Sequence, residues 1–215
     1  MTEFSLAAYF IAGSTAVSGA FGSGDTNIKS HIISHPAVVE IIAGNSDAQD
    51  RITDGLDRII KTPQIERYHY NVALAVEMLY AANGHLPEVN PKAVILGFTE
   101  NYLPALEAMN MPVLHHAVDV LAWGQEVSLP VPVGRWDDVT GQYYFDAAAR
   151  KAALAEMSAI GNVSQAIEKA EKANPDAFEN CDPEDVEHLL EFFQSLLNEA
   201  DRQGMDIALF RHGGV

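Results

Sequence analysis

Apolar side chains recur at three- and four-residue steps along most of the chain, a pattern typical of helices that bury one face. The clearest case follows Asp182-Pro183-Glu184-Asp185 and ends before Gly204. A capping aspartate, a proline in the first turn and early carboxylates favour a helix start, and glycine favours a helix end. The pattern therefore predicts a long helix between these two signals.

The same signals predict helices over most of the remaining chain. The expected ranges are about 2–18, 25–35 with an interruption or restart at Pro36 and a close at Gly44, 46–61, 64–83, 91–103 with a kink or end at Pro104, 112–124, 143–160 and 162–173. Strands do not alternate with helices as in an α/β fold, and no repeat of fixed period is evident. The sequence predicts a mainly α protein, a single-domain bundle of about seven to eight helices over residues 1–215.

Two segments depart from the helical pattern. Between residues 125 and 141, Val127 and Leu129 begin an alternation of apolar residues with polar residues or prolines. Because Pro130 and Pro132 cannot donate a backbone hydrogen bond, this predicts an extended, Pro-containing arm or edge strand. Residues 205–215 are expected to form a short strand or a tail.

The stretch from Phe4 to Gly24 contains no charged residue, and it is long enough to span a membrane as a helix. Ala, Gly and Ser dominate it, however, and no basic residue precedes it as in a secretory signal. We interpret it as a buried helix and expect no membrane association. Its stripe of Ala8, Ala12 and Ala16 would let a second helix approach closely, so it is a candidate contact for a homo-oligomer.

The formal net charge is −17, from 13 Lys and Arg against 30 Asp and Glu. This charge disfavours direct binding to nucleic acid or to an anionic membrane. The excess of negative charge is concentrated between residues 168 and 206, which contain twelve acidic residues and only three basic ones. Such a face is usually simply solvated, but it also suits a basic protein partner, with Glu184, Glu187 and Glu191 as the expected contacts. A surface that imitates nucleic acid is another reading of the same charge.

Common catalytic motifs are not found in the sequence. The single cysteine, Cys181, excludes an intrachain disulfide and suits a cytoplasmic protein. It precedes Asp182, Glu184 and Asp185, and carboxylates raise a thiol pKa, so we expect a poor nucleophile. The glycines between residues 19 and 24 lack the Lys and Ser or Thr of a phosphate-binding loop.

Histidines and carboxylates at helical spacing raise the possibility of a metal site. Glu66 and His69 form the Glu-x-x-His pattern that di-iron bundles turn inward, and His116 and Asp119 form a similar pair in reverse order. On a helical wheel His69 and His116 border apolar faces, whereas His188 lies among glutamates and should be exposed. These residues either hold iron or another divalent metal, or are hydrogen-bonded core residues. No second inner Glu-x-x-His completes a di-iron set.

Arg135 and Trp136 are the candidate recognition residues of the extended arm, because Trp and Arg are common binding anchors. The sequence therefore favours a non-catalytic binding or accessory protein that uses the acidic face or the Trp136 arm. The alternatives are a metal- or haem-dependent oxidase with a site at Glu66, His69, His116 and Asp119, and an acidic decoy of nucleic acid.

Overall fold

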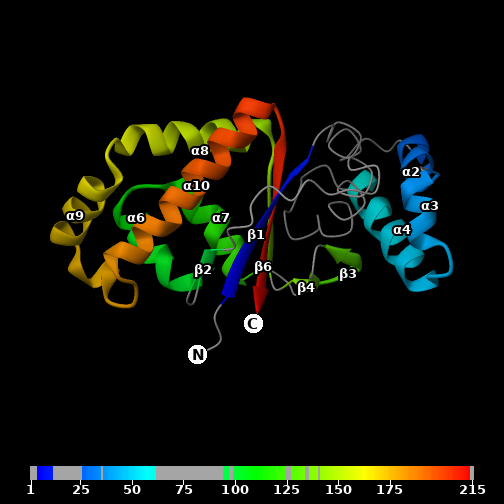
Figure 1. The fold of residues 1–215 in the computed structure, drawn as a ribbon, viewed down its shortest axis with the longest axis horizontal. Helices are drawn as coiled ribbons and strands as arrows, with labels where there is room; N and C mark the ends of the chain where they lie inside the picture. The colour runs from blue at the N-terminus through cyan, green and yellow to red at the C-terminus, as the bar shows by residue number, and fades with distance from the viewer. Residues whose placement is uncertain are drawn as a thin grey trace.

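The computed structural model describes residues 4–11, 26–34, 36–61, 94–96, 99–123, 127–133, 136–139 and 141–213. Most of these residues are helical, which confirms the mainly α prediction (Figure 1). The described ranges contain eight α-helices: α2 (Thr26–Ile33), α3 (Pro36–Ile42), α4 (Ser46–Lys61), α6 (Leu103–Ala108), α7 (Pro112–Trp123), α8 (Ala147–Ile160), α9 (Val163–Ala173) and α10 (Pro183–Gln203). Two short 3-10 helices, η2 (Thr99–Tyr102) and η3 (Pro175–Phe178), complete the helical part.

An antiparallel sheet that the helical pattern did not predict runs through the middle of the molecule (Figure 1). Its strand order is β2 (Val94–Leu96), β1 (Phe4–Ile11), β6 (Asp206–Gly213) and β5 (Gly141–Phe145). The two ends of the chain pair over their full length, from Phe4 opposite Gly213 to Ile11 opposite Asp206. Segments from the two ends of the sequence thus form the two interior strands.

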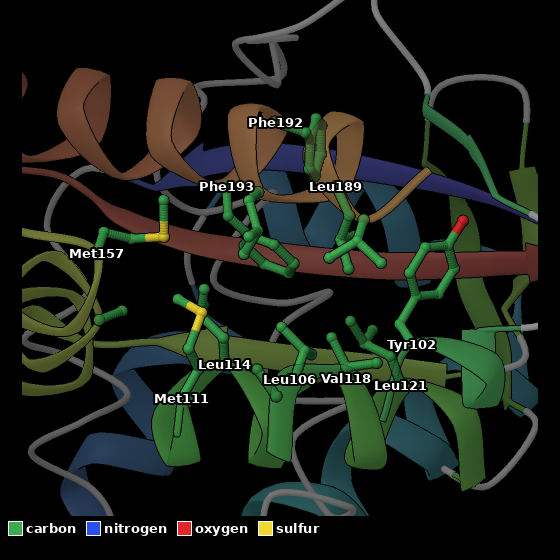
Figure 2. Packing of buried hydrophobic residues seen from close by; sticks show 14 of the residues in the cluster. Tyr102, Leu106, Met111, Leu114, Val118, Leu121, Met157, Leu189, Phe192 and Phe193 are labelled. Carbon is green, nitrogen blue, oxygen red and sulfur yellow. The ribbon is translucent and has the colours of Figure 1, made fainter. Parts of the chain in front are cut away.

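The main hydrophobic core lies between this sheet and the helices α6 to α10. Leu6, Tyr143, Ile207 and Leu209 contribute from the strands, and the rings of Phe145 and Phe193 join β5 to α10 with their centroids 6.2 Å apart. Figure 2 shows Leu189 and Phe193 of α10 pointing toward Leu114 and Val118 of α7. Burying these apolar surfaces is the main driving force that holds the layer together.

Helix α7 is held at both ends by side chains distant in sequence. At its start, the two carboxylate oxygens of Glu156 in α8 accept hydrogen bonds from the backbone N–H groups of Val113 (2.8 Å) and Leu114 (2.9 Å). At its end, Nη1 of Arg211 in β6 donates to the carbonyl of Ala122 over 2.8 Å. These partners satisfy terminal backbone groups and place opposite charges at the two ends of the helix dipole.

A buried polar cluster joins α8 to the start of β6. Nη1 of Arg150 lies 3.2 Å from the carboxylate of Asp206 and also donates to the carbonyl of Met205. The hydroxyl of Tyr144 donates to the other oxygen of Asp206 over 2.8 Å. Because Arg150 and Asp206 are both buried, removing either would leave an uncompensated charge.

Helices α2, α3 and α4 lie on the opposite side of the sheet from α6 to α10 (Figure 1). Ala48, Ile52 and Leu56 of α4 are buried at four-residue steps, together with Val38 of α3. Across α2 and α4, Nζ of Lys29 lies 2.6 Å from the carboxylate of Asp57. Asn45 caps α4: its side-chain oxygen accepts from the N–H of Ala48 over 3.0 Å.

Two predicted helix starts are wrong. Residues 4–11 of the helix expected at 2–18 form β1, and residues 94–96 of the helix expected at 91–103 form β2. The segment from Phe4 to Ile11 is apolar at most positions, so it fits a helical stripe and an interior strand equally well. Ala8 is therefore not on a helix face, and Ala12 and Ala16 lie outside the described residues, so the proposed oligomer stripe loses its basis.

The helix expected from Tyr143 begins later than predicted. Tyr143 to Phe145 pair with β6 instead, and α8 starts after Asp146, whose carboxylate accepts from the N–H of Ala149 over 2.7 Å. The predicted ranges of α7, α9 and α10 are confirmed, including Gly204, which ends α10 in the left-handed conformation at φ +67°. Asp182 is at the N-cap position of α10, but its side chain forms no capping hydrogen bond.

The extended, Pro-containing excursion is confirmed and consists of two paired strands. β3 (Val127–Val133) and β4 (Trp136–Val139) form a separate antiparallel pair. Their register shifts between Ser128 and Val133, the span that holds both prolines. A proline lacks the N–H that a regular ladder needs, which accounts for the irregularity. The segment expected to be a short strand or tail at 205–215 contains the interior strand β6.

Candidate functional site

A groove lined by carboxylates lies between α9 and the first turns of α10. Its volume is about 380 Å³. Glu168 and Glu171 line it from α9, and Glu184 and Glu187 line it from α10. Residues three apart share one face of a helix, so each helix directs a pair of carboxylates to the same groove. We call this feature the acidic groove.

Local sequence signals place the two helices that form the acidic groove. Asn162 caps α9 by accepting from the N–H of Gln165 over 2.9 Å. The short helix η3 then reverses the chain, and α10 begins with Pro183 in its first turn after Asp182. Carboxylates at the start of α10 are stabilised by the helix dipole. These local signals fix where each helix begins, and the packing of α9 against α10 then forms the groove.

Polar contacts in the acidic groove leave part of its charge unpaired. Lys172 pairs with Glu168, and its hydrogen bond and charge lower the pKa of that carboxyl. The hydroxyl of Ser164 donates to Glu187. Among the described residues, Glu171 and Glu184 form no ion pair with a Lys or Arg. The groove therefore has a net negative charge.

The floor of the acidic groove is apolar. Ile167 is almost fully buried there, and Pro183 is half-buried beside it. A Lys or Arg side chain has a matching form, because its methylene stem packs on apolar surface while its cationic head stays near water and carboxylates. The arrangement therefore suits a basic side chain of another molecule better than a free metal ion.

The acidic segment of the sequence is divided by the fold. Asp206 is buried against Arg150, Asp201 lies 3.5 Å from the same guanidinium, and Glu199 pairs with Arg202. The end of α10 is therefore partly neutralised. The exposed negative charge gathers around α9 and the start of α10, where the acidic groove lies.

The structure brings together two of the expected partner-binding residues. Glu184 and Glu187 line the acidic groove, whereas Glu191 is exposed one turn further along α10 and does not line it. The sequence analysis did not select Glu168 and Glu171, although their spacing of three residues matches that of Glu184 and Glu187. Arg135 lies outside the described residues, and for Trp136 the structure describes only the backbone in β4.

The expected metal site is only half described. Glu66 and His69 lie outside the described residues. His116 and Asp119 are on α7, where His116 is exposed and its ring meets that of Tyr143 edge-on, with centroids 5.8 Å apart. Within the described ranges, no group of three or more His, Cys, Asp or Glu side chains could hold a metal ion.

His116 borders the buried residues Ala117 and Val120 of α7, as the helical wheel indicated, but its own side chain is exposed, so it is not a core histidine. The buried face of α7 is centred on Leu114, Val118 and Leu121, and His116 lies roughly 165° around the helix from that centre at 100° per residue. Val113 and Val120 form the edge of this broad apolar surface that is nearer to His116. His188 is exposed, as predicted.

Trp123 is an exposed residue that the sequence analysis missed. It ends α7 with 64% of its surface exposed, on the same helix face as His116. Exposed tryptophans are frequent anchors in protein interfaces. The one available signal was its position seven residues after His116, which repeats the same helix face.

Cys181 has the character of a structural thiol. It is buried, and desolvation together with the charges of Asp185 and Asp182 raises its pKa to about 12. A thiol with so high a pKa is a poor nucleophile at neutral pH. This agrees with the direction expected from the neighbouring carboxylates.

Comparison with known proteins gives no relative. No family model matches the chain, and neither a curated protein nor a solved structure is similar to it at a significant level. In the described ranges, none of the helices has both the length and the apolar character needed to cross a membrane.

Proposed function

We propose that this protein is a non-catalytic binding protein that holds a Lys- or Arg-rich segment of a protein partner in the acidic groove. The observation that carries the proposal is that two helices each place two carboxylates around the same apolar floor, which Ile167 and Pro183 form. Such a groove offers a basic side chain both a stem contact and a counter-charge. A cytoplasmic setting, expected from the single cysteine, belongs to the same proposal.

Two features support binding rather than catalysis. The groove residues are carboxylates and one hydroxyl, and the neighbouring Cys181 has its pKa raised rather than lowered. A nucleophilic or acid–base site normally requires a side chain whose pKa is moved toward neutrality. The acidic groove instead provides charge complementarity, which sets partner choice and the rate of encounter.

The test is fluorescence anisotropy with a labelled peptide of alternating Arg and Gly. The groove variant is Glu184→Gln with Glu187→Gln, which removes two charges and keeps an acceptor for Ser164. The control is Glu179→Gln with Glu191→Gln, which removes two exposed charges outside the groove. Both variants have the same net charge, so non-specific attraction affects them equally.

We expect the groove variant to weaken peptide binding about five- to tenfold, since each exposed ion pair contributes roughly 0.2–1 kcal/mol. The control should change it less than twofold. Added salt should weaken binding of the unaltered protein. Equal losses in the two double variants would show that net charge alone attracts the peptide and would refute the groove assignment. Circular dichroism should show both variants folded.

A further inference from the structure

A second cleft lies on the other side of α9, away from the acidic groove. It is formed by the end of α6, the end of α8 and the face of α9 that carries Gln165 and Lys169, and its volume is about 490 Å³. This size falls within the range of small-molecule sites. We call it the Lys169 cleft.

The Lys169 cleft exists because short side chains line it. Ala108 of α6, Ala159 of α8 and Ala166 and Ala173 of α9 contribute only methyl groups, so space remains between the three helices. Met109 and Ala170 also line the cleft and belong to the main hydrophobic core. The floor of the cleft is therefore a continuation of that core and presents apolar surface to a ligand.

The charge of the Lys169 cleft is opposite to that of its surroundings. Among the described residues that line it, Lys169 is the single charged one, and none is a carboxylate. Among the described residues, Lys169 takes part in no ion pair, whereas Lys172 pairs with Glu168 on the acidic side of α9. In a chain of net charge −17, a cleft with only a cation is a distinct feature.

Amide groups at the rim add hydrogen-bonding capacity. Asn110, Asn162 and Gln165 line the cleft. The side-chain oxygen of Asn162 already accepts from the backbone N–H of Gln165, whereas the side-chain amides of Asn110 and Gln165 form no hydrogen bond within the described part of the chain. Asn110 also holds the left-handed backbone conformation at φ +56°, which fixes the turn between α6 and α7.

We propose that the Lys169 cleft binds a small apolar molecule that carries one carboxylate. The apolar body lies on Met109 and the alanines, and the carboxylate lies toward Lys169 and the rim amides. A single cation matches a monocarboxylate, whereas a phosphate group is usually held by several positive or N–H donors. The site is separate from the acidic groove and does not depend on the function proposed for it.

Isothermal titration calorimetry with octanoate, octan-1-ol and octylammonium tests this proposal, since the three share one alkyl chain. We expect saturable binding that is tighter for octanoate than for octan-1-ol. Octylammonium is titrated into the Glu184→Gln, Glu187→Gln variant, whose acidic groove has lost two carboxylates, and should bind there more weakly than octan-1-ol. Lys169→Met should reduce the preference for octanoate over octanol about two- to fivefold, the range of an exposed ion pair. The matched control Lys172→Met, which alters the cation paired with Glu168, should leave that preference unchanged.

A second variant tests the space rather than the charge. Ala173 lines the cleft and is exposed, so Ala173→Leu fills the cleft from the solvent side without overpacking the core. We expect it to weaken octanoate binding at least tenfold while the melting temperature is retained. Absence of saturable octanoate binding, or binding unchanged by both Lys169→Met and Ala173→Leu, would overturn the proposal. A protein dimer that Ala173→Leu converts to monomer would show a second copy in the cleft and would also overturn it.

Discussion

Gly141 lies directly against the backbone of Leu121: a Cβ atom at position 141 would be 2.1 Å from the Leu121 carbonyl oxygen. This contact joins the first residue of β5 to the end of α7. On β6, the residue opposite Gly141 is Arg211, which donates to the carbonyl of the next residue in α7, Ala122. The start of β5 and the end of α7 are therefore fitted to each other without room for any side chain.

Replacing Gly141 by Ala should destabilise the protein by about 3 kcal/mol, because helix or strand must move to relieve the overlap. Urea denaturation measures this as a lower midpoint with little change in slope. The control is Gly44→Ala, where a Cβ would meet nothing within 4 Å and the cost arises only from φ +79°, about 1 kcal/mol. If both substitutions lowered the free energy of unfolding by the same amount, Gly141 would not lie in close contact with Leu121.

Glu156→Ala should cost about 1–3 kcal/mol, since it leaves two N–H groups at the start of α7 without their charged acceptor. Glu156→Gln should cost less, because the amide oxygen can still accept one hydrogen bond. Thermal unfolding followed by circular dichroism gives the comparison. Glu179→Gln, an exposed carboxylate, should stay within about 0.5 kcal/mol of the unaltered protein. If Glu156→Ala left the free energy of unfolding unchanged, Glu156 would not stabilise the start of α7 and the prediction would be wrong.

Cys181 should react with iodoacetamide about a thousandfold more slowly in the native protein than in urea at pH 8. The reason is that burial and the neighbouring carboxylates raise its pKa from 9.0 to about 12, so native thiolate is scarce. Asp185→Asn should lower the pKa of the thiol and speed the reaction. Native and unfolded protein reacting at one rate would contradict the raised pKa.

The same pKa shift makes stability depend on pH. Between pH 9 and 12 the folded thiol keeps its proton while the unfolded thiol loses it, so the free energy of unfolding should fall as pH rises. The part that arises from Cys181 is about 1 kcal/mol at pH 10. Comparing Cys181→Ala with the unaltered protein at pH 8 and pH 10 isolates it. The alanine variant should lose less stability across this interval, and a larger loss would reverse the expected sign.

Trp123 should behave as a solvent-exposed tryptophan. In a Trp136→Phe variant, its emission should be red-shifted and strongly quenched by acrylamide, because 64% of its surface is exposed. Trp123→Ala should change the free energy of unfolding by less than about 0.5 kcal/mol. A blue-shifted spectrum that resists quenching would show that Trp123 is covered in solution.

The sequence predicted those helices whose ends are determined by residues at the ends themselves. Pro112 begins α7, Asp182-Pro183 begins α10 and Gly204 ends it, and each lies where the sequence signal indicates. Capping and backbone preferences act over a few residues, so they can be recognised without knowing the fold. The poor reactivity expected of Cys181 followed in the same way from its sequence neighbours.

The carboxylates of the acidic groove were visible in the sequence only as a charged segment. Glu184 and Glu187 could be named because they share a helix face, but their meeting with Glu168 and Glu171 depends on α9 packing against α10. The pairing of Asp206 with Arg150, 56 residues apart, was likewise hidden. Local spacing indicates which face a residue occupies and not which element covers that face.

Tertiary structure alone decided the sheet and the burial of α7. The apolar run from Phe4 to Ile11 fits a helix or an interior strand, and its pairing with residues 206–213 at the other end of the chain selects the strand. In α7, where most side chains are apolar, only the elements packed around it determine that His116 and Trp123 face solvent. Local preferences of a fraction of a kcal/mol per residue set helix ends, whereas burial across the whole core sets the partners.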